Sequence, residues 1–486
     1  MERSHPTRLP SFRDPAGRLV NAEGRILRWI SPSHRDEFEA SAGSPVVRRG
    51  IEHGQIISYH VLDPSEAREL AERYELTEPG ATDRGELVLE HERVPFPSFP
   101  YEWPPEMLQA AGGLTLDLAE SLLDDGLGFK DATPYNVLFR GADPVFIDIL
   151  SIERRDPQDP LWLPYAQFAR TFLLPLLLHQ RFALPLESLL LGRRDGIEPE
   201  EAYRICGPLA RLRPPVLTLV TLPTWLGSGR EDAKIYRKRR VRSAEQASYI
   251  LRGILKGLRR QLARLKGSGK KWSRWSNYVE ARESYTTGQL EQKTKFVEQV
   301  LHKYRPRRVL DAGCNTGQFS VQAARAGASV VAIDSDAVVV GRLWRQAHAE
   351  RLDILPLVIN LARPSPAVGW QNAECASFLD RTKGGFDAVF FLALLHHLLI
   401  SERIPLAEVV NLVAEITTDL AVIEFVGTAD PMFQRLLRGR EALYQQLTTD
   451  VFESTLRKQF TILQSEQLTD SSRHLYLVKK LPSSKT

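Results

Sequence analysis

The sequence predicts an α/β protein whose C-terminal half is a doubly wound parallel sheet, and three observations support this fold class. From about residue 275 to residue 480, short apolar runs typical of strands alternate with helical stretches. A turn that contains Gly313 and Gly317 follows the first run, and the run at 329–333 ends at Asp334. A strand, a glycine turn, a helix and a second strand tipped by an acid form the first half of a nucleotide-binding βαβ unit.

The order of the predicted elements follows from the length and spacing of the apolar runs. Helices are expected at 292–301 and 318–326. Parallel strands are expected at 308–311, 329–333, 354–359, 386–392 and 420–425, with a last antiparallel strand at 474–479. Ligands of such sheets bind beyond the carboxyl ends of the strands, so the residues that follow each strand are the site candidates.

The spacing of the glycine turn, Asp311-x-Gly313-x-x-x-Gly317, differs from that of a dinucleotide site. A pyrophosphate needs the Gly-x-Gly-x-x-Gly spacing, and an acid before the first glycine would repel it. The same acid suits a ligand that carries an ammonium group. Asp334 suits a ribose, because a carboxylate can accept hydrogen bonds from both ribose hydroxyls.

The turn resembles the first motif of class I S-adenosylmethionine (SAM) methyltransferases, in the variant Asp-x-Gly-Cys-Asn-x-Gly. The resemblance implies a Rossmann-like domain over residues 275–486 with SAM as its cofactor. It also implies cofactor contacts from the turn and from the following strand ends, where Asn360 and Leu361 would serve adenine. The implied set is Asp311, Gly313, Cys314, Asn315, Gly317, Asp334, Ser335, Asn360, Leu361 and Leu392.

Further motifs look like a narrower bacterial methyltransferase family that includes nodulation-associated members. They are Trp275-Ser276-Asn277-Tyr278, Pro364-Ser365-Pro366, Gly369-Trp370, His396-His397 and Asp430-Pro431-Met432. This resemblance does not fix the acceptor; a glycan or glycolipid is our hypothesis.

Three residues near the strand ends are candidates for catalysis. His396 and His397 follow the strand at 386–392, and a neutral imidazole can accept the proton of an incoming hydroxyl or amine. We favour His396 slightly; the alternative is that one histidine caps the strand end and packs structurally. Glu424, in the strand at 420–425, could orient the acceptor or assist proton removal, or it could be a partly buried acid paired with an arginine.

The N-terminal half contains a pattern that resembles the catalytic loop and metal-binding strand of protein and aminoglycoside kinases. Asp131 is followed by Asn136, and Asp148 ends the next apolar run. In that chemistry Asp131 would act as the base, and Asn136 and Asp148 would bind magnesium. However, no glycine-rich loop and no lysine precede Lys130. Two interpretations stay open, an inactive kinase-like domain and an unrelated α+β domain.

A strongly basic segment lies between the two halves. Residues 230–274 contain sixteen Lys/Arg and three Asp/Glu, in a chain whose net charge is +4. Residues 250–266 form a basic amphipathic helix. It is either a connector packed on one domain or a contact with an anionic membrane surface. The segment does not favour nucleic acid as a partner, since no aromatic residues are interleaved with the charges.

The predicted organisation is therefore an α+β domain at 1–228, a basic helical linker at 229–274 and a methyltransferase domain at 275–486. Apolar residues (43%) and charged residues (26%) have the proportions of a globular protein. Three scattered cysteines predict neither a metal site nor disulfides, and no signal peptide begins the chain, so we expect a cytoplasmic protein. The sequence makes no prediction of oligomeric state.

The leading functional hypothesis is SAM-dependent methyl transfer to an oxygen or nitrogen of a small-molecule or glycan acceptor. Two alternatives stay open. The first is a bifunctional kinase–methyltransferase, and the second is a non-catalytic regulator that binds SAM or a glycan.

Overall fold

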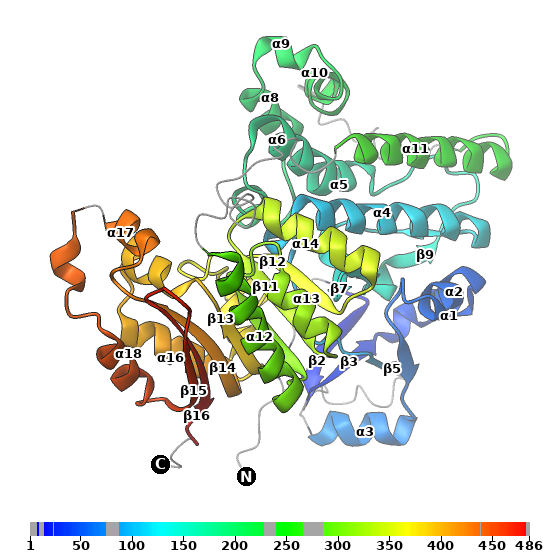
Figure 1. Ribbon diagram of the computed structural model, residues 1–486. Helices are drawn as coiled ribbons and strands as arrows, with labels where there is room; N and C mark the ends of the chain where they lie inside the picture. Colours follow the sequence, from blue (N-terminus) through cyan, green and yellow to red (C-terminus); the bar gives the residue numbers. More distant parts are fainter. Residues whose placement is uncertain are drawn as a thin grey trace.

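A computed structural model describes residues 7–8, 14–22, 24–73, 87–227, 240–265, 285–437 and 439–482 of the chain (Figure 1). The Trp275–Tyr278 motif and both predicted linker boundaries lie outside these described residues. The C-terminal half contains a seven-stranded sheet in the order β12-β11-β10-β13-β14-β16-β15. Its strands are β10 (Arg308–Ala312), β11 (Ser329–Asp334), β12 (Ile354–Val358), β13 (Phe386–Phe391), β14 (Thr417–Val426), β15 (Phe460–Gln467) and β16 (Arg473–Lys480).

Strands β10 to β14 are parallel, and β16 inserts antiparallel between β14 and β15. The parallel strands are almost continuously buried because helices flank the sheet. These helices are α12 (Thr287–Tyr304), α13 (Gln318–Arg325), α14 (Ala337–Glu350), α15 (Phe378–Thr382), α16 (Leu406–Ile416), α17 (Pro431–Leu437) and α18 (Thr449–Leu456). Figure 1 shows α12, α13 and α14 in front of the sheet. The predicted doubly wound fold is confirmed.

The N-terminal half is an α+β assembly, as predicted. An antiparallel sheet has the order β1-β2-β3-β5-β4. Its strands are β1 (Thr7–Arg8), β2 (Gly17–Ala22), β3 (Arg25–Ile30), β4 (Tyr59–Val61) and β5 (Leu87–His91), with helices α1 (Arg35–Gly43), α2 (Pro45–Glu52) and α3 (Pro64–Arg73). The chain then forms helix α4 (Pro105–Leu122) and two small antiparallel pairs, β6 (Leu127–Phe129) with β9 (Ile152–Arg154) and β7 (Val137–Arg140) with β8 (Asp143–Phe146).

The kinase-like character of this half stays a prediction, but the structure adds a partner to its pattern. Nη1 of Arg28, on β3, donates to Oδ1 of Asp148 at 2.9 Å. Asp131 accepts a hydrogen bond from Nε2 of Gln167 at 3.2 Å. The carboxylate of Asp148 is thus paired with a cation, and this cation is an arginine, since no lysine precedes residue 130.

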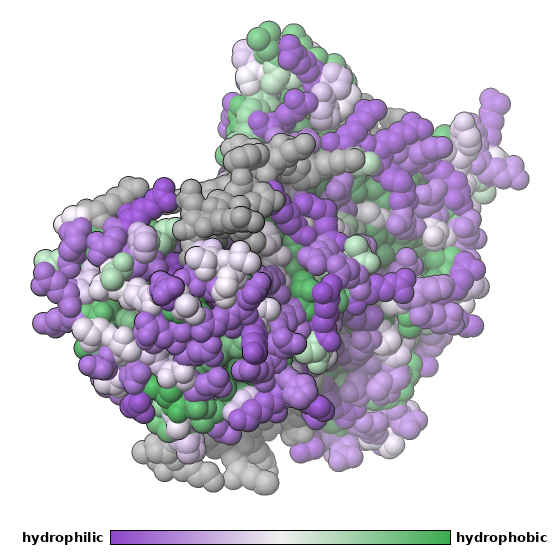
Figure 2. All heavy atoms as spheres, in the orientation of Figure 1, coloured by the Kyte–Doolittle hydropathy of each residue, from purple (hydrophilic) through white to green (hydrophobic). Residues whose placement is uncertain are grey.

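A helical region completes this half of the chain. It contains α5 (Tyr165–Phe168), α6 (Leu174–Phe182), α7 (Leu186–Leu190), α8 (Pro199–Ile205), α9 (Pro208–Arg211) and α10 (Leu222–Gly227). Helices α8, α9 and α10 project from the rest of the molecule as a small lobe (Figure 1). Figure 2 shows hydrophobic residues at the tip of this lobe, above a surface that is mostly hydrophilic.

The predicted basic helix is α11 (Ala244–Arg264), and it packs on α4. Its buried side chains include Leu251, Leu255, Leu258 and Leu262. Two of its arginines pair with acids of α4 and of the turn that follows α4. Arg252 pairs with Glu120 and Asp124, and Arg259 pairs with Asp117 and Glu120. The apolar face of the helix therefore packs against protein, as the connector interpretation expects. Contact of residues 250–266 with a membrane stays a prediction, and it concerns only the basic outer face of the helix.

A buried ion pair joins the two halves of the chain. Arg381, at the end of α15, pairs with Glu102 of the N-terminal half, and both side chains are at most 5% exposed. Glu102 also accepts from the hydroxyl of Ser365, and Arg381 donates to the carbonyl of Pro97 at 2.6 Å. The motif Pro364-Ser365-Pro366 thus has a structural position at the contact between the halves.

We expect Arg381→Ala to destabilise the whole chain, since it leaves the buried carboxylate of Glu102 without its cation. The loss in free energy of unfolding should be about 3–5 kcal/mol, measured by urea denaturation. Arg363→Ala is the matched control, because Arg363 pairs with Glu402 at the surface and is 69% exposed, so its loss should stay within about 1 kcal/mol. Equal losses of unfolding free energy in the two variants would contradict the view that the buried Arg381–Glu102 pair holds the two halves together.

Candidate active site

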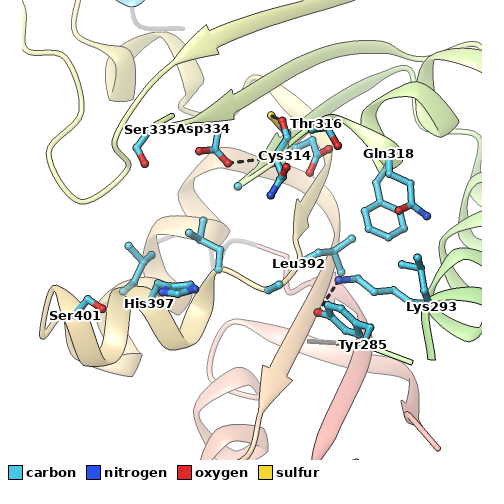
Figure 3. Close-up of a pocket in the computed structure, with 18 of the residues that line it drawn as sticks. Tyr285, Lys293, Cys314, Thr316, Gln318, Asp334, Ser335, Leu392, His397 and Ser401 are labelled. Atoms are coloured by element: carbon cyan, nitrogen blue, oxygen red, sulfur yellow. Dashed lines mark hydrogen bonds between the residues drawn. The ribbon is translucent and has the colours of Figure 1, made fainter. Parts of the chain in front are cut away.

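A cavity of about 480 Å³ opens beyond the carboxyl ends of β10, β11 and β13, where the sequence placed the site. Figure 3 shows Asp334 and Ser335 on one side of it, Lys293 and Tyr285 on the opposite side, and His397 and Ser401 on a third. The lining residues are Tyr285, Thr286, Thr287, Leu290, Lys293, Asp311, Gly313, Cys314, Asn315, Thr316, Gln318, Phe319, Asp334, Ser335, Asn360, Leu392, Ala393, Leu394, His397, Leu398, Ser401, Glu402 and Leu436.

The glycine turn needs its glycines for both backbone conformation and space. Gly313 and Gly317 have φ angles of 76° and 85°, in the left-handed region. A Cβ on Gly317 would lie 2.2 Å from a methyl carbon of Leu343, and one on Gly313 would lie 3.3 Å from Leu394 at the cavity wall. Gly317 therefore seats α13 against α14, and Gly313 leaves room at the floor of the cavity.

Two buried carboxylates lie beside this turn. Asp334 accepts from the backbone amides of Asn315 and Asp336, each at 3.0 Å. Asp311 accepts from the hydroxyl of Ser320 at 2.5 Å. Burial raises the pKa of each carboxyl to about 6, although these hydrogen bonds act in the opposite direction. A ligand that presents hydroxyls or positive charge to these oxygens would favour their ionised forms.

The cavity wall opposite Asp334 rests on a buried charge network in which Glu424 is paired with an arginine, as in one of the two alternatives from the sequence, and with Lys293, which the sequence did not indicate. Nζ of Lys293, on α12, lies 2.7 Å from Oε2 of Glu424 and 3.1 Å from the hydroxyl of Tyr285. The Tyr285 hydroxyl donates to Oε1 of Glu424 at 2.7 Å. Arg473 lies over the ring of Tyr285 and pairs with Glu424 and Asp430. Burial alone would raise the pKa of Glu424, but Lys293 and Arg473 outweigh it and hold that pKa below its usual value.

The structure separates the predicted site residues into two groups. Nine of them line the cavity, and they are Asp311, Gly313, Cys314, Asn315, Asp334, Ser335, Asn360, Leu392 and His397. Gly317, Leu361, His396 and Glu424 are not among the lining residues. Several polar lining residues were not selected from the sequence, and among them Tyr285, Lys293 and Gln318 belong to α12, the residues just before it or the start of α13.

The two adjacent histidines differ in environment. His396 is 1% exposed, and neither ring nitrogen has a hydrogen-bond partner among the described residues. Burial lowers its pKa well below the usual range, so its ring is neutral at physiological pH. His397 lines the cavity, and its ring centroid lies 4.2 Å from that of His396. The structure therefore brings His397 to the cavity and packs His396 behind it.

A second cavity of about 410 Å³ shares the wall formed by Tyr285 and Thr286. Its other lining residues are Gln289, Ala429, Asp430, Pro431, Met432, Asp470, Ser471, Ser472 and Arg473, so the Asp430-Pro431-Met432 motif belongs to it. Most of these residues are polar, and the hydroxyl of Ser472 is buried without a partner among the described residues.

The seven-stranded sheet and the cavity of about 480 Å³ at the carboxyl ends of its parallel strands define a class I SAM-dependent methyltransferase. A family model described as a methyltransferase domain matches residues 310–418. The chain is 31% identical over 472 residues to nodulation protein NoeA of Rhizobium meliloti (strain 1021). These aligned residues cover 97% of this chain and 95% of that protein. The chain therefore belongs to the NoeA family.

Solved structures are similar over the methyltransferase fold at low identity. Magnesium protoporphyrin IX methyltransferase from Synechocystis PCC 6803 with bound SAH is 18% identical, with 42% of this chain and 94% of that chain covered and a TM-score of 0.31. N-methyltransferase NodS from Bradyrhizobium japonicum WM9 is 12% identical, with 40% and 98% covered and a TM-score of 0.29. The bifunctional kinase-methyltransferase WbdD is 17% identical, with 42% and 41% covered and a TM-score of 0.30.

We predict that the affinity for SAM falls as the pH drops through 6. The pKa of Asp334 and that of Asp311 are raised to about 6, so both carboxyls are largely ionised above pH 7 and protonated below pH 5. A protonated carboxyl loses charge and acceptor capacity, so affinity measured by calorimetry should fall by about tenfold between pH 7 and pH 5.

Asp334→Asn should bind SAM more weakly at pH 7 and show a flatter pH profile. Glu408→Gln, an exposed acid on α16, should keep the wild-type profile. An affinity that is constant from pH 5 to pH 8 in the unmodified protein would contradict this account.

Proposed function

We propose that this SAM-dependent methyltransferase methylates an oxygen or nitrogen of a polyhydroxylated small molecule, a glycan or glycolipid. The observation that carries the proposal is the second, polar cavity, which shares Tyr285 and Thr286 as lining residues with the cofactor cavity. Hydroxyls of a sugar need many hydrogen-bonding partners, and the lining of this cavity includes carboxylate, amide and hydroxyl groups.

The lining residues fit SAM in one orientation along the cofactor cavity. Asp334 would bind the ribose hydroxyls, and Asn360 would contact adenine. Asp311 would face the ammonium group. Lys293 would bind the carboxylate of the methionine part, because an ammonium group has three donors and, among the described residues, those of Lys293 are given two acceptors, Glu424 and Tyr285. When bound, SAM supplies a methyl group on a sulfonium centre, already activated for transfer.

Two tasks remain for the protein, the positioning of the acceptor and the removal of its proton. Positioning the acceptor in line with the methyl group supplies much of the rate. A hydroxyl or amine acceptor also releases a proton, and we assign its removal to a ring nitrogen of His397. His397 lines the cavity, whereas His396 is buried behind it. Glu424 acts as a positioning residue in this proposal, because it holds Tyr285 and Lys293 and is itself fully buried.

The bifunctional alternative depends on the N-terminal half. Its acidic pattern has a buried cation, Arg28, bound to Asp148. We favour a half without phosphoryl transfer, since the chain has no lysine before residue 130 and no glycine-rich loop. Magnesium-dependent transfer of phosphate from ATP that is lost in Asp148→Ala would favour the bifunctional enzyme instead.

The acceptor class can be tested with labelled SAM. The full chain is incubated with labelled SAM and fractionated cell extract, and the labelled product is isolated. Label in a carbohydrate or glycolipid fraction supports the proposal. Label confined to protein or nucleic acid contradicts the acceptor class, and binding of SAM without transfer to any fraction favours the non-catalytic regulator.

Once an acceptor is in hand, His397→Ala should reduce single-turnover methylation by about 10²–10⁴-fold while SAM affinity stays nearly unchanged. His396→Ala is the matched comparison. Because His396 is buried and neutral, its loss should lower the melting temperature by creating a cavity and should affect turnover less. Loss of turnover in His396→Ala with full turnover in His397→Ala would reverse the assignment.

A further inference from the structure

The projecting lobe of residues 199–227 carries an unusual set of exposed apolar side chains. Leu226 is 78% exposed, Leu209 76% and Leu212 62%. Trp225, Ile205 and Leu222 are also exposed. Helices α8, α9 and α10 bring these residues onto one projection, and Figure 2 shows hydrophobic residues at its tip. A group of exposed apolar side chains on one small projection is typical of an interaction site.

The lobe is an ordered structure with its own small core. Ala202, Val216, Leu219 and Val220 are buried within it. The guanidinium of Arg211 lies 3.8 Å from the ring centroid of Tyr203, and the hydroxyl of Thr221 donates to the carbonyl of Arg211 at 2.7 Å. The exposed leucines and Trp225 are thus held outward by a packed support.

Positive charge flanks the base of the lobe. Arg181 and Arg264 line a depression together with Pro214 and Pro215. The residue before Pro214 in the sequence is Arg213, which is exposed. Within the described part of the chain, no carboxylate is paired with these three arginines; Arg181 donates only to the carbonyl of Pro214, at 3.4 Å. The two acids of the lobe lie in the first turn of α8.

We propose that this lobe docks the protein on an anionic membrane surface. In this arrangement Trp225 and the exposed leucines enter the headgroup boundary, and Arg181, Arg213 and Arg264 contact anionic lipid. A tryptophan beside leucines suits the interface, where its amphipathic ring lies at the headgroup level. The N–H of Trp225 donates to the hydroxyl of Tyr203 at 3.3 Å. Basic residues close to such an apolar tip add attraction to anionic lipid.

The shape of the surface and the burial of α11 favour a bilayer as the occupant. The apolar residues lie on a convex projection, and a fluid bilayer accommodates a projection without a complementary groove. The basic helix predicted from the sequence packs on α4 and buries its leucines Leu251, Leu255, Leu258 and Leu262, so these leucines are not available for insertion. Among the described helices, none has the length and apolar character needed to cross a bilayer.

Co-sedimentation of the full chain with vesicles tests the proposal. The protein should bind vesicles of phosphatidylcholine that contain phosphatidylglycerol, and bind pure phosphatidylcholine vesicles weakly. The double variant Trp225→Ser, Leu226→Ser should lower binding by about tenfold or more, because its apolar insertion is lost. Leu443→Ser, at an exposed leucine outside the lobe (73% exposed), should bind like the unmodified protein.

The charge contribution is tested separately. Replacing Arg181, Arg213 and Arg264 with glutamine should lower binding to the anionic vesicles by about fivefold per arginine. The same change at three exposed lysines elsewhere, Lys303, Lys383 and Lys458, should have little effect. All variants should keep their melting temperature and SAM affinity, since none of these residues lines the cofactor cavity.

Three outcomes would overturn the proposal. The first is no binding of the unmodified protein to anionic vesicles at low salt. The second is unchanged binding in the Trp225, Leu226 variant. The third is a change from dimer to monomer in that variant, measured by light scattering, because it would assign the lobe to a second copy of the chain.

Discussion

The buried charge network of Lys293, Glu424, Arg473 and Asp430 is the interaction on which the candidate active site most depends. It links helix α12 to strand β14 with the loop that follows it and to strand β16, three regions that are far apart in the sequence. Removing one member of such a network leaves a buried charge uncompensated, at a cost of about 3–5 kcal/mol. The network therefore fixes the wall shared by the two cavities, and Tyr285 takes its position from it.

Helix α4 has a comparable role between the two halves of the chain. It contacts α11, α14 and β8, so the basic helix and helix α14 of the methyltransferase half pack on one support. Beside it, Arg381 and Ser365 of the methyltransferase half meet Glu102. The N-terminal half is thus joined to the catalytic half through buried contacts, and a surface on one half keeps a fixed relation to the cavity on the other.

The sequence predicted the parts of the fold that local patterns encode. The five parallel strands, the glycine turn and the acid of Asp334 are local features, and their predicted bounds lie within a few residues of those observed. Strand β15 was missed because it is an edge strand with mostly exposed or half-buried residues, so it lacks an apolar run. Arg28 was missed because only tertiary structure brings β3 to Asp148.

The candidate site was predicted where it depends on strand ends and missed where it depends on packing. Lys293 and Tyr285 precede the first strand, and nothing in their spacing indicates that α12 and the residues just before it direct them toward Glu424. The choice between His396 and His397 depends on backbone geometry, since Ala393 has a φ angle of 55° and a π-helical turn covers His397–Ser401. Neither feature has a clear sequence pattern.

The central claim is that SAM extends from Asp334 to Lys293, and paired ligands test it most directly. Calorimetry would compare S-adenosylhomocysteine with 5′-methylthioadenosine, which has the ribose but lacks the amino acid part. Lys293→Gln should weaken binding of S-adenosylhomocysteine by about 10–100-fold, the effect of a lost charged hydrogen bond, and leave methylthioadenosine unchanged. Asp334→Asn should weaken both ligands alike, and Lys303→Gln on the same helix should weaken neither. Equal weakening of both ligands in Lys293→Gln, or no effect on either, would contradict the claim.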